Sequence, residues 1–459
     1  MSQWAWWVGI DLGSGKHEAC ILDGKGDVRR RFSFDHTPQG LARFVAVLGE
    51  EVGYRYESVA VAMENNQGMV CDALLERGAA VHSINPKQLD RFRDRYNVAG
   101  AKDDRLDALV LADSLRTDTR LYRRVEPLPE ESLRLRELSR ELEELDKLFQ
   151  QQANRLWSLL SRYFPVLLRF CPGADEPWLW ELLKQAGTPK KAAALTEKRL
   201  GNILKPFRIR RFSPAELLAA LKAKGEGGDP LTAEVCEEHS RAILKHLALV
   251  HRQIADQQKK ICRILRPGGP KARPTVPGGM KEAEESTRET GGTDESPSPP
   301  DDVPTDTADG PPVTDKEIVL SIPGIGWKTG AAILGEAAQA LAQRDYRALR
   351  GEAGTAPVTK RSGKTSYTVM RRACNYRLRR ALHYAAGVAI LHVGRWREIY
   401  HRIRSRGGSH ARALRQIGDK MLKVLVVMLR NRSLFDITRF DGNSLNVEKQ
   451  SGTSRQFSA

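Results

Sequence analysis

The sequence predicts a mixed α/β domain at the N-terminus, followed by a long and mainly helical remainder. Between Trp6 and Leu121, short apolar runs alternate with amphipathic segments and glycine-rich turns, which is the pattern of strands interleaved with helices. From Glu130 onward, leucine and isoleucine recur at steps of three and four residues, which is the helical period. A chain of 459 residues also exceeds one ordinary hydrophobic core, so we expect about three domains.

The order of the N-terminal elements predicts which strands are neighbours. Three strands joined by tight turns come first, a helix follows, and a fourth strand then returns to the sheet. This order is typical of an RNase H-like sheet, in which the first and fourth strands lie side by side. The predicted strands cover 6–11, 17–22, 28–34, 59–63 and 80–84, and the predicted helices cover 41–48 and 70–77.

Four carboxylates are candidate metal ligands in this arrangement. Asp11 ends the first strand and Glu64 closes the fourth, so strand pairing would bring them together. Asp104 and Asp107 lie three residues apart in a helix-compatible segment, which places both on one helix face. Hard divalent cations prefer oxygen ligands, and two ions about 4 Å apart can hold the attacking and leaving oxygens of a phosphoryl transfer. The pattern predicts a Mg²⁺ (or Mn²⁺) site that acts on phosphodiesters.

The turn after the first predicted strand is similar to two known phosphate-binding motifs but matches neither of them. Residues 13–16 read Gly-Ser-Gly-Lys, as in a phosphate loop, but Ile10 stands where the first glycine is required and His17 replaces Ser or Thr. Residues 9–14 also resemble the first phosphate segment of actin-like kinases and chaperones. Those proteins repeat the domain, whereas the later part of this sequence contains no second copy of the motif.

The formal net charge of +17 indicates a polyanionic partner, most commonly nucleic acid, although charge does not exclude a ribosomal or membrane-surface role. No apolar run reaches about 18 residues and the N-terminus lacks a signal-peptide pattern, so we expect a soluble cytoplasmic protein without a membrane partner. The six cysteines form no Cys-x-x-Cys pair, which favours reduced thiols over a zinc ribbon or a disulfide framework.

Two long amphipathic segments, 130–168 and 231–265, predict either an antiparallel coiled-coil arm for dimerisation or two helices of an ordinary bundle. Residues 267–312 are rich in Pro, Gly, Ser, Thr and acids and nearly lack large apolar side chains, which predicts a disordered linker. The predicted regions are a catalytic domain at 1–125, a helical region at 126–266, a linker at 267–315, a C-terminal catalytic domain at 316–432 and a flexible tail at 433–459.

A glycine-rich turn follows the linker. Residues 322–326 read Ile-Pro-Gly-Ile-Gly and are similar to the hairpin of a helix-hairpin-helix element. Such a turn offers backbone N–H groups of Gly324 and Gly326 to a DNA phosphate, and Lys328 adds positive charge. The alternative is a simple turn between two helices.

Residues 347–432 form the most basic block of the chain and contain a candidate nucleophile. Ser362 is expected in a turn among cations that can hold a phosphodiester while the hydroxyl attacks it. A serine that only contacts phosphate fits the same pattern. The cations around Ser362 are Lys360, Arg361 and Lys364, and further phosphate contacts are predicted at Arg371, Arg372, Arg377 and Arg380.

A rival constellation in this block is His392-x-x-Arg395 with Tyr400, which is similar to tyrosine recombinases. Tyr400 follows too closely for the usual spacing of those enzymes. His392 is therefore interpreted as a packing or phosphate-contacting residue.

The motifs in this order resemble the DEDD-type transposases of the insertion sequence one-ten family. The resemblance rests on Gly9-Ile10-Asp11, on Glu64 at the end of its strand and on residues 102–108. It continues through 322–326, 354–357, 362–364 and 375–382, and it covers nearly all of the chain except 267–312 and the tail after 431.

This resemblance implies a RuvC-like, Mg²⁺-dependent N-terminal domain and a mainly helical C-terminal transposase domain whose serine attacks DNA. The implied acids are Asp11, Glu64, Asp104 and Asp107, and the implied nucleophile is Ser362. The resemblance also implies a structured guide RNA that pairs with donor and target duplex DNA. We expect a homodimer or homotetramer, which the predicted coiled coil would allow.

Two other functions fit the same residues. A metal-dependent nuclease of the Holliday-junction resolvase type would use the same acids with water as the nucleophile. A non-catalytic nucleic-acid-binding protein would need only the basic charge.

Overall fold

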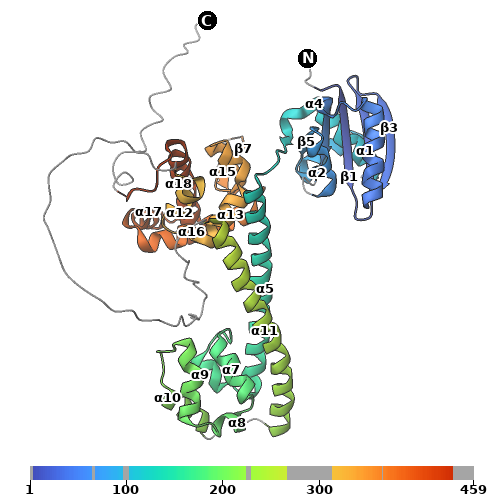
Figure 1. Cartoon of the computed structure of the whole chain (residues 1–459). Coiled ribbons are helices and arrows are strands. Elements are labelled where there is room, and N and C mark those ends of the chain that lie inside the picture. Colours follow the sequence, from blue (N-terminus) through green and yellow to red (C-terminus); the bar gives the residue numbers. More distant parts are fainter. Residues whose placement is uncertain are drawn as a thin grey trace, which may run out of the picture. The chain divides into compact units, whose positions relative to one another are not determined.

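The computed structural model describes residues 4–64, 68–96, 103–223, 229–265, 313–363 and 365–437 (Figure 1). They belong to two compact units, unit 1 up to Leu128 and unit 2 from Pro129 onward. The predicted linker at 267–312 and most of the predicted tail lie outside the described residues. No helix within the described ranges is long and apolar enough to cross a bilayer.

Unit 1 is built on a mixed sheet with the strand order β3-β2-β1-β4-β5-β6 among its described residues. β1 and β4 pair in parallel, as do β4 and β5, while the β1–β2–β3 meander and the β5–β6 pair are antiparallel. The predicted adjacency of the first and fourth strands is therefore confirmed. The strands are β1 (Trp6–Leu12), β2 (Lys16–Asp23), β3 (Val28–Asp35), β4 (Val59–Met63), β5 (Ala80–Ser83) and β6 (Arg123–Arg124).

Helices cover both faces of this sheet. α1 (Pro38–Val52) and α2 (Met69–Glu76) pack on the face that carries Val8 and Ile10, and α4 (Asp104–Asp118) packs on the face that carries Trp7. α3 (Pro86–Arg93) lies against α4. Because β1 is buried on both faces, it reads as a continuous apolar run rather than as an alternating one.

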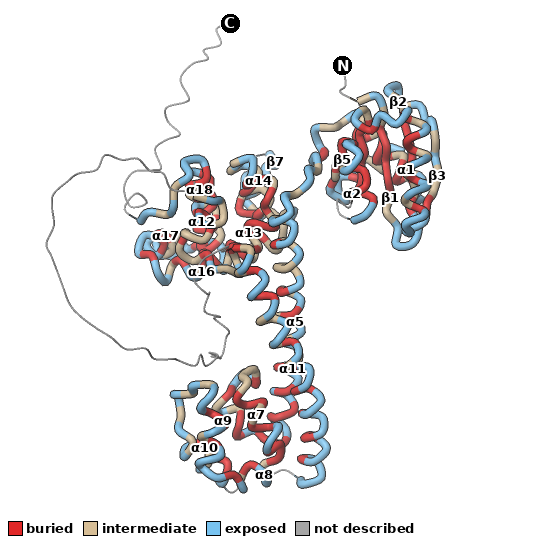
Figure 2. The backbone as a smooth tube through the Cα atoms, in the orientation of Figure 1, coloured by how far each residue is buried: buried red, intermediate tan, exposed pale blue. Residues whose placement is uncertain are grey.

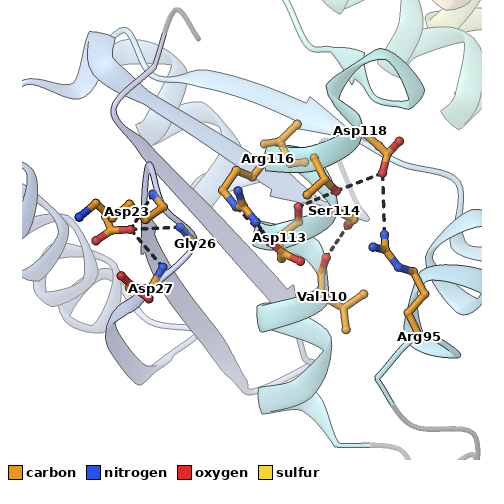
Figure 3. A network of polar contacts seen from close by, with 12 residues as sticks. Asp23, Gly26, Asp27, Arg95, Val110, Asp113, Ser114, Arg116 and Asp118 are labelled. Atoms are coloured by element: carbon orange, nitrogen blue, oxygen red, sulfur yellow. Dashed lines mark hydrogen bonds and ion pairs between the residues drawn. The ribbon is translucent and has the colours of Figure 1, made fainter. Parts of the chain in front are cut away.

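Local polar contacts fix the turn after β2 and the outer end of α4 (Figure 3). The Asp23 carboxylate accepts hydrogen bonds from the backbone N–H groups of Lys25, Gly26 and Asp27 at 2.9–3.1 Å, which closes the β2–β3 turn. In α4, Arg116 donates to Asp113 at 2.6 Å. The first set of contacts stabilises the turn, and the second is an i,i+3 ion pair within α4.

Unit 2 is organised around two long helices, α5 (Glu130–Tyr163) and α11 (Pro230–Leu265), which pack side by side (Figure 1). Figure 2 shows buried positions recurring along both helices. Helix α5 ends at Tyr163 and not at 168 as predicted, because Pro165 has no N–H to continue the helix and disfavours helical geometry at Phe164. The coiled-coil interpretation of this pair remains a prediction.

Short helices between α5 and α11 close a second core over the far end of the pair. Proline occupies the first helical position in α7, α8 and α10, where its missing N–H costs no hydrogen bond. These helices are α6 (Val166–Phe170), α7 (Pro177–Gln185), α8 (Pro189–Ala193), α9 (Glu197–Leu204) and α10 (Pro214–Lys222).

The C-terminal helices pack on the other end of the α5–α11 pair and share one core with it, to which Leu135 and Ile261 contribute. The chain leaves this core at the end of α11 and re-enters it at α12, where Lys316 donates to the Ile264 carbonyl at 3.0 Å. The elements are α12 (Asp315–Ser321), α13 (Trp327–Glu336), α14 (Ala338–Ala342), α15 (Tyr346–Glu352), β7 (Val358–Ser362), β8 (Thr365–Val369), α16 (Tyr376–His392), α17 (Gly394–Ser405) and α18 (His410–Asn431).

A buried ion pair joins three of these helices. The Glu336 side chain, 2 % exposed, accepts hydrogen bonds from Arg140 at 2.7 and 3.0 Å and from Asn375 at 2.7 Å. Burial by itself would raise the pKa of Glu336, but these hydrogen bonds hold it below its ordinary value. The contact therefore ties α5, α13 and α16 together through one ionised carboxylate.

Candidate active site

Three of the four predicted acids lie together in unit 1. Asp11 stands near the end of β1, while Asp104 and Asp107 lie in the first turn of α4. One carboxylate oxygen from each residue lies within 4.8 Å of those of the other two, which is close enough for all three to bind one cation. Asp107 is buried, Asp11 is half-buried and Asp104 is exposed, so the cluster has a buried wall and a side open to solvent.

The start of α4 explains the different positions of neighbouring acids. Asp103 is the N-cap residue, and its carboxylate accepts a hydrogen bond from the Arg105 N–H at 3.0 Å. Asp104 and Asp107 follow inside the first helical turn, where the partial positive charge of the helix N-terminus stabilises ionised carboxylates. Asp103 therefore caps the helix, and Asp104 is the residue that joins Asp107 in the cluster.

The close approach of α4 to β1 depends on Gly9. A Cβ atom at this position would lie 1.9 Å from the Ala108 carbonyl oxygen and 2.5 Å from the Ala112 nitrogen. Trp7, Gly9 and Asp11 alternate onto one face of the sheet, which is the face covered by α4. The absence of a side chain at Gly9 thus lets the helix bring its acids to Asp11.

Glu64, the fourth predicted acid, directly follows β4 and is exposed. It lies outside the group of three carboxylates, but the register pairs Ile10 with Met63, so Glu64 follows at the level of Asp11 on the neighbouring strand. Ala62 belongs to the core beneath α4, and strand alternation places Glu64 on the same side. Glu64 is thus at the border of the cluster.

Arg93 also contacts this cluster, although no motif or spacing in the sequence predicts it. It donates from Nε to Oδ1 of Asp107 at 2.5 Å and from Nη2 to Oδ2 at 2.8 Å, and its Nη1 donates to Asp90 at 2.7 Å. The hydrogen bonds to Asp107 raise the pKa of Arg93 against the effect of burial, and the negative charge of Glu64 acts in the same direction. The guanidinium therefore occupies both oxygens of a predicted metal ligand.

We expect Arg93→Gln to bind Mn²⁺ about tenfold more tightly, because the hydrogen bonds and charge of Arg93 no longer compete for the Asp107 oxygens. Isothermal titration of the full chain with Mn²⁺ measures this change. Arg91→Gln, an exposed position on the same helix, is the matched control. Weaker binding by Arg93→Gln would contradict the prediction and would mean that Arg93 orients Asp107 for the cation.

Ser362 lies in unit 2, at the last position of β7 rather than in the loop that the sequence predicted. β7 and β8 form an exposed antiparallel hairpin in which Ser362 pairs with Thr365. Gly363, with φ of +54°, begins the tight turn between them. A strand position holds the Ser362 hydroxyl more rigidly than a loop would.

The predicted nucleic-acid contacts fall into two groups. Lys360 and Arg361 on β7 and Arg372 after β8 are exposed, Arg371 is half-buried, and Lys364 lies outside the described residues. The second group bonds to acids of α5: Arg377 and Arg380 bind Glu143 at 3.1 and 2.9 Å, and Lys328 pairs with Asp146.

Close packing explains one of the two glycines in the turn between α12 and α13. Gly324 has φ of +94°, and a Cβ there would lie 2.3 Å from the Ala385 carbonyl oxygen of α16. Gly326 is the exposed N-cap residue of α13. Their binding of DNA phosphate remains a prediction.

The rival residues lie on two consecutive helices of unit 2, His392 on α16 and both Arg395 and Tyr400 on α17. The Tyr400 hydroxyl on α17 is 2.9 Å from Nδ1 of His410, and His392 is the last residue of α16. Tyr400 therefore has a hydrogen-bond partner from α18 rather than His392.

Comparison with known proteins identifies the family. A family model described as "Transposase", of the DEDD type, matches residues 8–165. A second, described as "Transposase IS116/IS110/IS902 family", matches residues 316–402. The first range contains the acid cluster and the second contains Ser362.

Similar individual proteins carry related names. "Putative transposase y4uE" of Sinorhizobium fredii is 40% identical over 223 residues, which cover 48% of this chain and only 62% of that protein. "Mini-circle putative transposase for IS117" of Streptomyces coelicolor is 28% identical over 442 residues, which cover 94% of this chain and 95% of that protein. "Insertion element IS116 uncharacterized 44.8 kDa protein" of Streptomyces clavuligerus is 25% identical over 439 residues, 94% of this chain and 96% of that protein. Since two models of the same family match in succession, over residues 8–165 and 316–402, the chain belongs to the IS110 family of transposases.

Proposed function

We propose that this protein cuts and rejoins DNA by means of a metal-binding acid cluster and a serine nucleophile. The observation that carries the proposal is the gathering of Asp11, Asp104 and Asp107 from a strand and a helix into one group of oxygens. The strand order of unit 1 supports an RNase H-like, RuvC-like assignment for this domain. Glu64 is proposed as the fourth acid, since it lies level with Asp11.

In the proposed reaction, the Ser362 hydroxyl attacks a phosphodiester and its proton is lost to a base. A bond forms between Oγ and phosphorus, the bond from phosphorus to the 3′-oxygen breaks, and the leaving oxygen takes up a proton. The DNA is left with a free 3′-OH and a 5′-phosphoserine link, whose reversal with another 3′-OH rejoins strands without hydrolysis. Bound Mg²⁺ (or Mn²⁺) would supply Lewis-acid stabilisation of charge on the phosphate oxygens.

Lys360 and Arg361 flank the nucleophile and are proposed to hold the scissile phosphate. The partners we propose are donor and target duplex DNA and a structured guide RNA, acting with a homodimer or homotetramer in the bacterial cytoplasm. These partners rest on the family resemblance and on the positive net charge of +17.

The covalent link provides the test. We expect Ser362→Ala to form no protein–DNA adduct, because the variant lacks the oxygen proposed to attack phosphorus. The assay incubates end-labelled donor DNA, Mg²⁺ and the transcript of the flanking non-coding DNA with the protein, and detects adducts on denaturing gels. Thr359→Val, which removes a hydroxyl from the same strand, is expected to form the adduct normally.

An adduct formed by Ser362→Ala would exclude this serine as the nucleophile. Cleavage without any adduct, in wild type and Ser362→Ala alike, would instead identify a RuvC-type nuclease that uses water.

A further inference from the structure

The strongest unassigned feature of unit 2 is a cavity of about 990 Å³ enclosed by β8, α15, α17 and α18. Its wall is strongly basic and contains one acid, Asp419. None of the cations predicted from the sequence to bind nucleic acid lines it. The basic residues in the wall are Arg350, Arg395, Arg402, Arg412, Arg415, Lys420 and Lys423.

Asp419 does not offset this charge, because it is engaged by its neighbours. Arg350 donates to its two oxygens at 3.1 and 2.8 Å, Thr355 donates at 2.7 Å and Tyr346 donates at 3.1 Å. The carboxylate thus forms a fixed unit with Arg350. Arg395 is also paired within the protein, with Glu398 at 3.0 Å.

Four of these cations, Arg402, Arg412, Arg415 and Lys420, form no ion pair within 4 Å in the described part of the chain. Arg412 and Lys420 are exposed along one face of α18 at helical spacing, and Arg402 of α17 faces the same cavity. Burial and the positive charges of Arg412 and Arg379 lower the pKa of Arg415. Like charges gathered in this way are stabilised by an anion with several negative groups.

The hairpin gives this cavity an aromatic wall next to Ser362. Tyr367 of β8 is 52% exposed, lines the cavity and pairs across the hairpin with Lys360. Since cross-strand partners share a face and faces alternate, Ser362 lies on the same face as Tyr367, two positions away or about 7 Å along the strand. The predicted nucleophile therefore shares a face of the hairpin with Tyr367, one residue of the cavity wall.

We infer that the cavity binds the single strand of DNA that adjoins the phosphate attacked by Ser362. Arg402, Arg412, Arg415 and Lys420 hold its phosphates, and one unpaired base stacks on Tyr367. Cationic grooves with aromatic platforms are the usual means of binding single strands, and this cavity combines an exposed tyrosine with several cations. The position next to the scissile phosphate rests on the proposed role of Ser362, whereas strand binding itself does not.

The test measures binding of the full chain to a fluorescent oligodeoxythymidylate by anisotropy, in EDTA, over a series of NaCl concentrations. We expect Arg412→Gln/Arg415→Gln to weaken binding at least tenfold and to reduce the salt slope by about 1.4, because single strands contribute about 0.7 per phosphate contact. Tyr367→Ala should weaken binding about tenfold at an unchanged slope, whereas Tyr367→Phe should bind like wild type because it keeps the stacking surface.

The matched control is Lys198→Gln/Lys245→Gln, which removes the same charge from exposed positions on α9 and α11. The inference is overturned if this control lowers the salt slope as much as the arginine double variant, or if Tyr367→Ala binds like wild type. It is also overturned if the arginine variant loses more affinity for duplex DNA or for oligouridylate than for the DNA single strand. Thermal melting of each variant excludes loss of folding.

Failure of the cavity inference can be distinguished from failure of the proposed function. A cavity that fails these tests leaves the adduct assay of Ser362 unaffected. Conversely, an adduct formed by Ser362→Ala would exclude Ser362 as the nucleophile. It would not bear on single-strand binding by the cavity, which is measured in EDTA.

Discussion

Asp11→Asn is expected to lower DNA cleavage and adduct formation by about 10³-fold or more. An amide is a neutral and weaker ligand than a carboxylate, and the metal ion in such a site supplies several kcal/mol of transition-state stabilisation. Each 1.36 kcal/mol corresponds to about tenfold in rate. The side chain keeps its size, so the half-buried position near Asp104 and Asp107 is expected to remain folded.

The measurement is the cleavage rate under single-turnover conditions in Mg²⁺, together with the Mn²⁺ titration. Asp72→Asn is the matched control, because Asp72 is an exposed acid of the same unit on α2 and lies outside the cluster. If Asp11→Asn keeps the cleavage rate and changes only DNA affinity, the acid cluster is not catalytic. The third function considered, a non-catalytic binding protein, predicts that result.

Gly9→Ala is expected to destabilise unit 1 by about 3 kcal/mol, which is at the upper end for an overpacked core. The added Cβ would meet backbone atoms of α4, the Ala108 oxygen and the Ala112 nitrogen, which cannot move aside as a flexible side chain can. The helix must shift as a whole. The carboxylates of its first turn then move away from Asp11, so we expect Mn²⁺ affinity to fall even in the fraction that stays folded.

Thermal unfolding and Mn²⁺ titration of the variant test both effects. The matched control is Gly24→Ala in the β2–β3 turn, where a Cβ would meet only Trp7 at an ordinary 3.7 Å. A Gly9→Ala protein that melts and binds Mn²⁺ like wild type would show that α4 is not held against β1 in the way described.

The sequence predicts five of the six strands described in unit 1, because β1, β4 and β5 are apolar runs and the β2–β3 turn carries glycine. The strand β6 was missed because its two residues are both arginine. The order of these elements along the chain predicted that β1 lies beside β4, and Asp104 and Asp107 were placed by their spacing on one helix. The end of α5 was missed because the apolar period continues past Pro165, although the proline stops the helix.

Features made by distant residues could not be predicted. Ser362 was assigned to a loop because β7 is a polar strand with no apolar face, so its hairpin carries no alternation signal. Arg377 and Arg380 are predicted to contact phosphate, and the sequence does not indicate their partner Glu143, which lies 234 and 237 residues earlier in the chain. Arg93 reaches Asp107 only because α3 lies against α4, and no spacing rule describes that contact.

The hydrogen bond from Lys316 to the Ile264 carbonyl has a consequence for how the family can vary in length. It joins the last turn of α11 to the first turn of α12, so the residues on either side of 266–312 belong to one core. Closing a flexible loop costs free energy that grows only with the logarithm of its length, by about 0.6 kcal/mol for each doubling. Insertions and deletions here can therefore accumulate while the helices on either side keep their places.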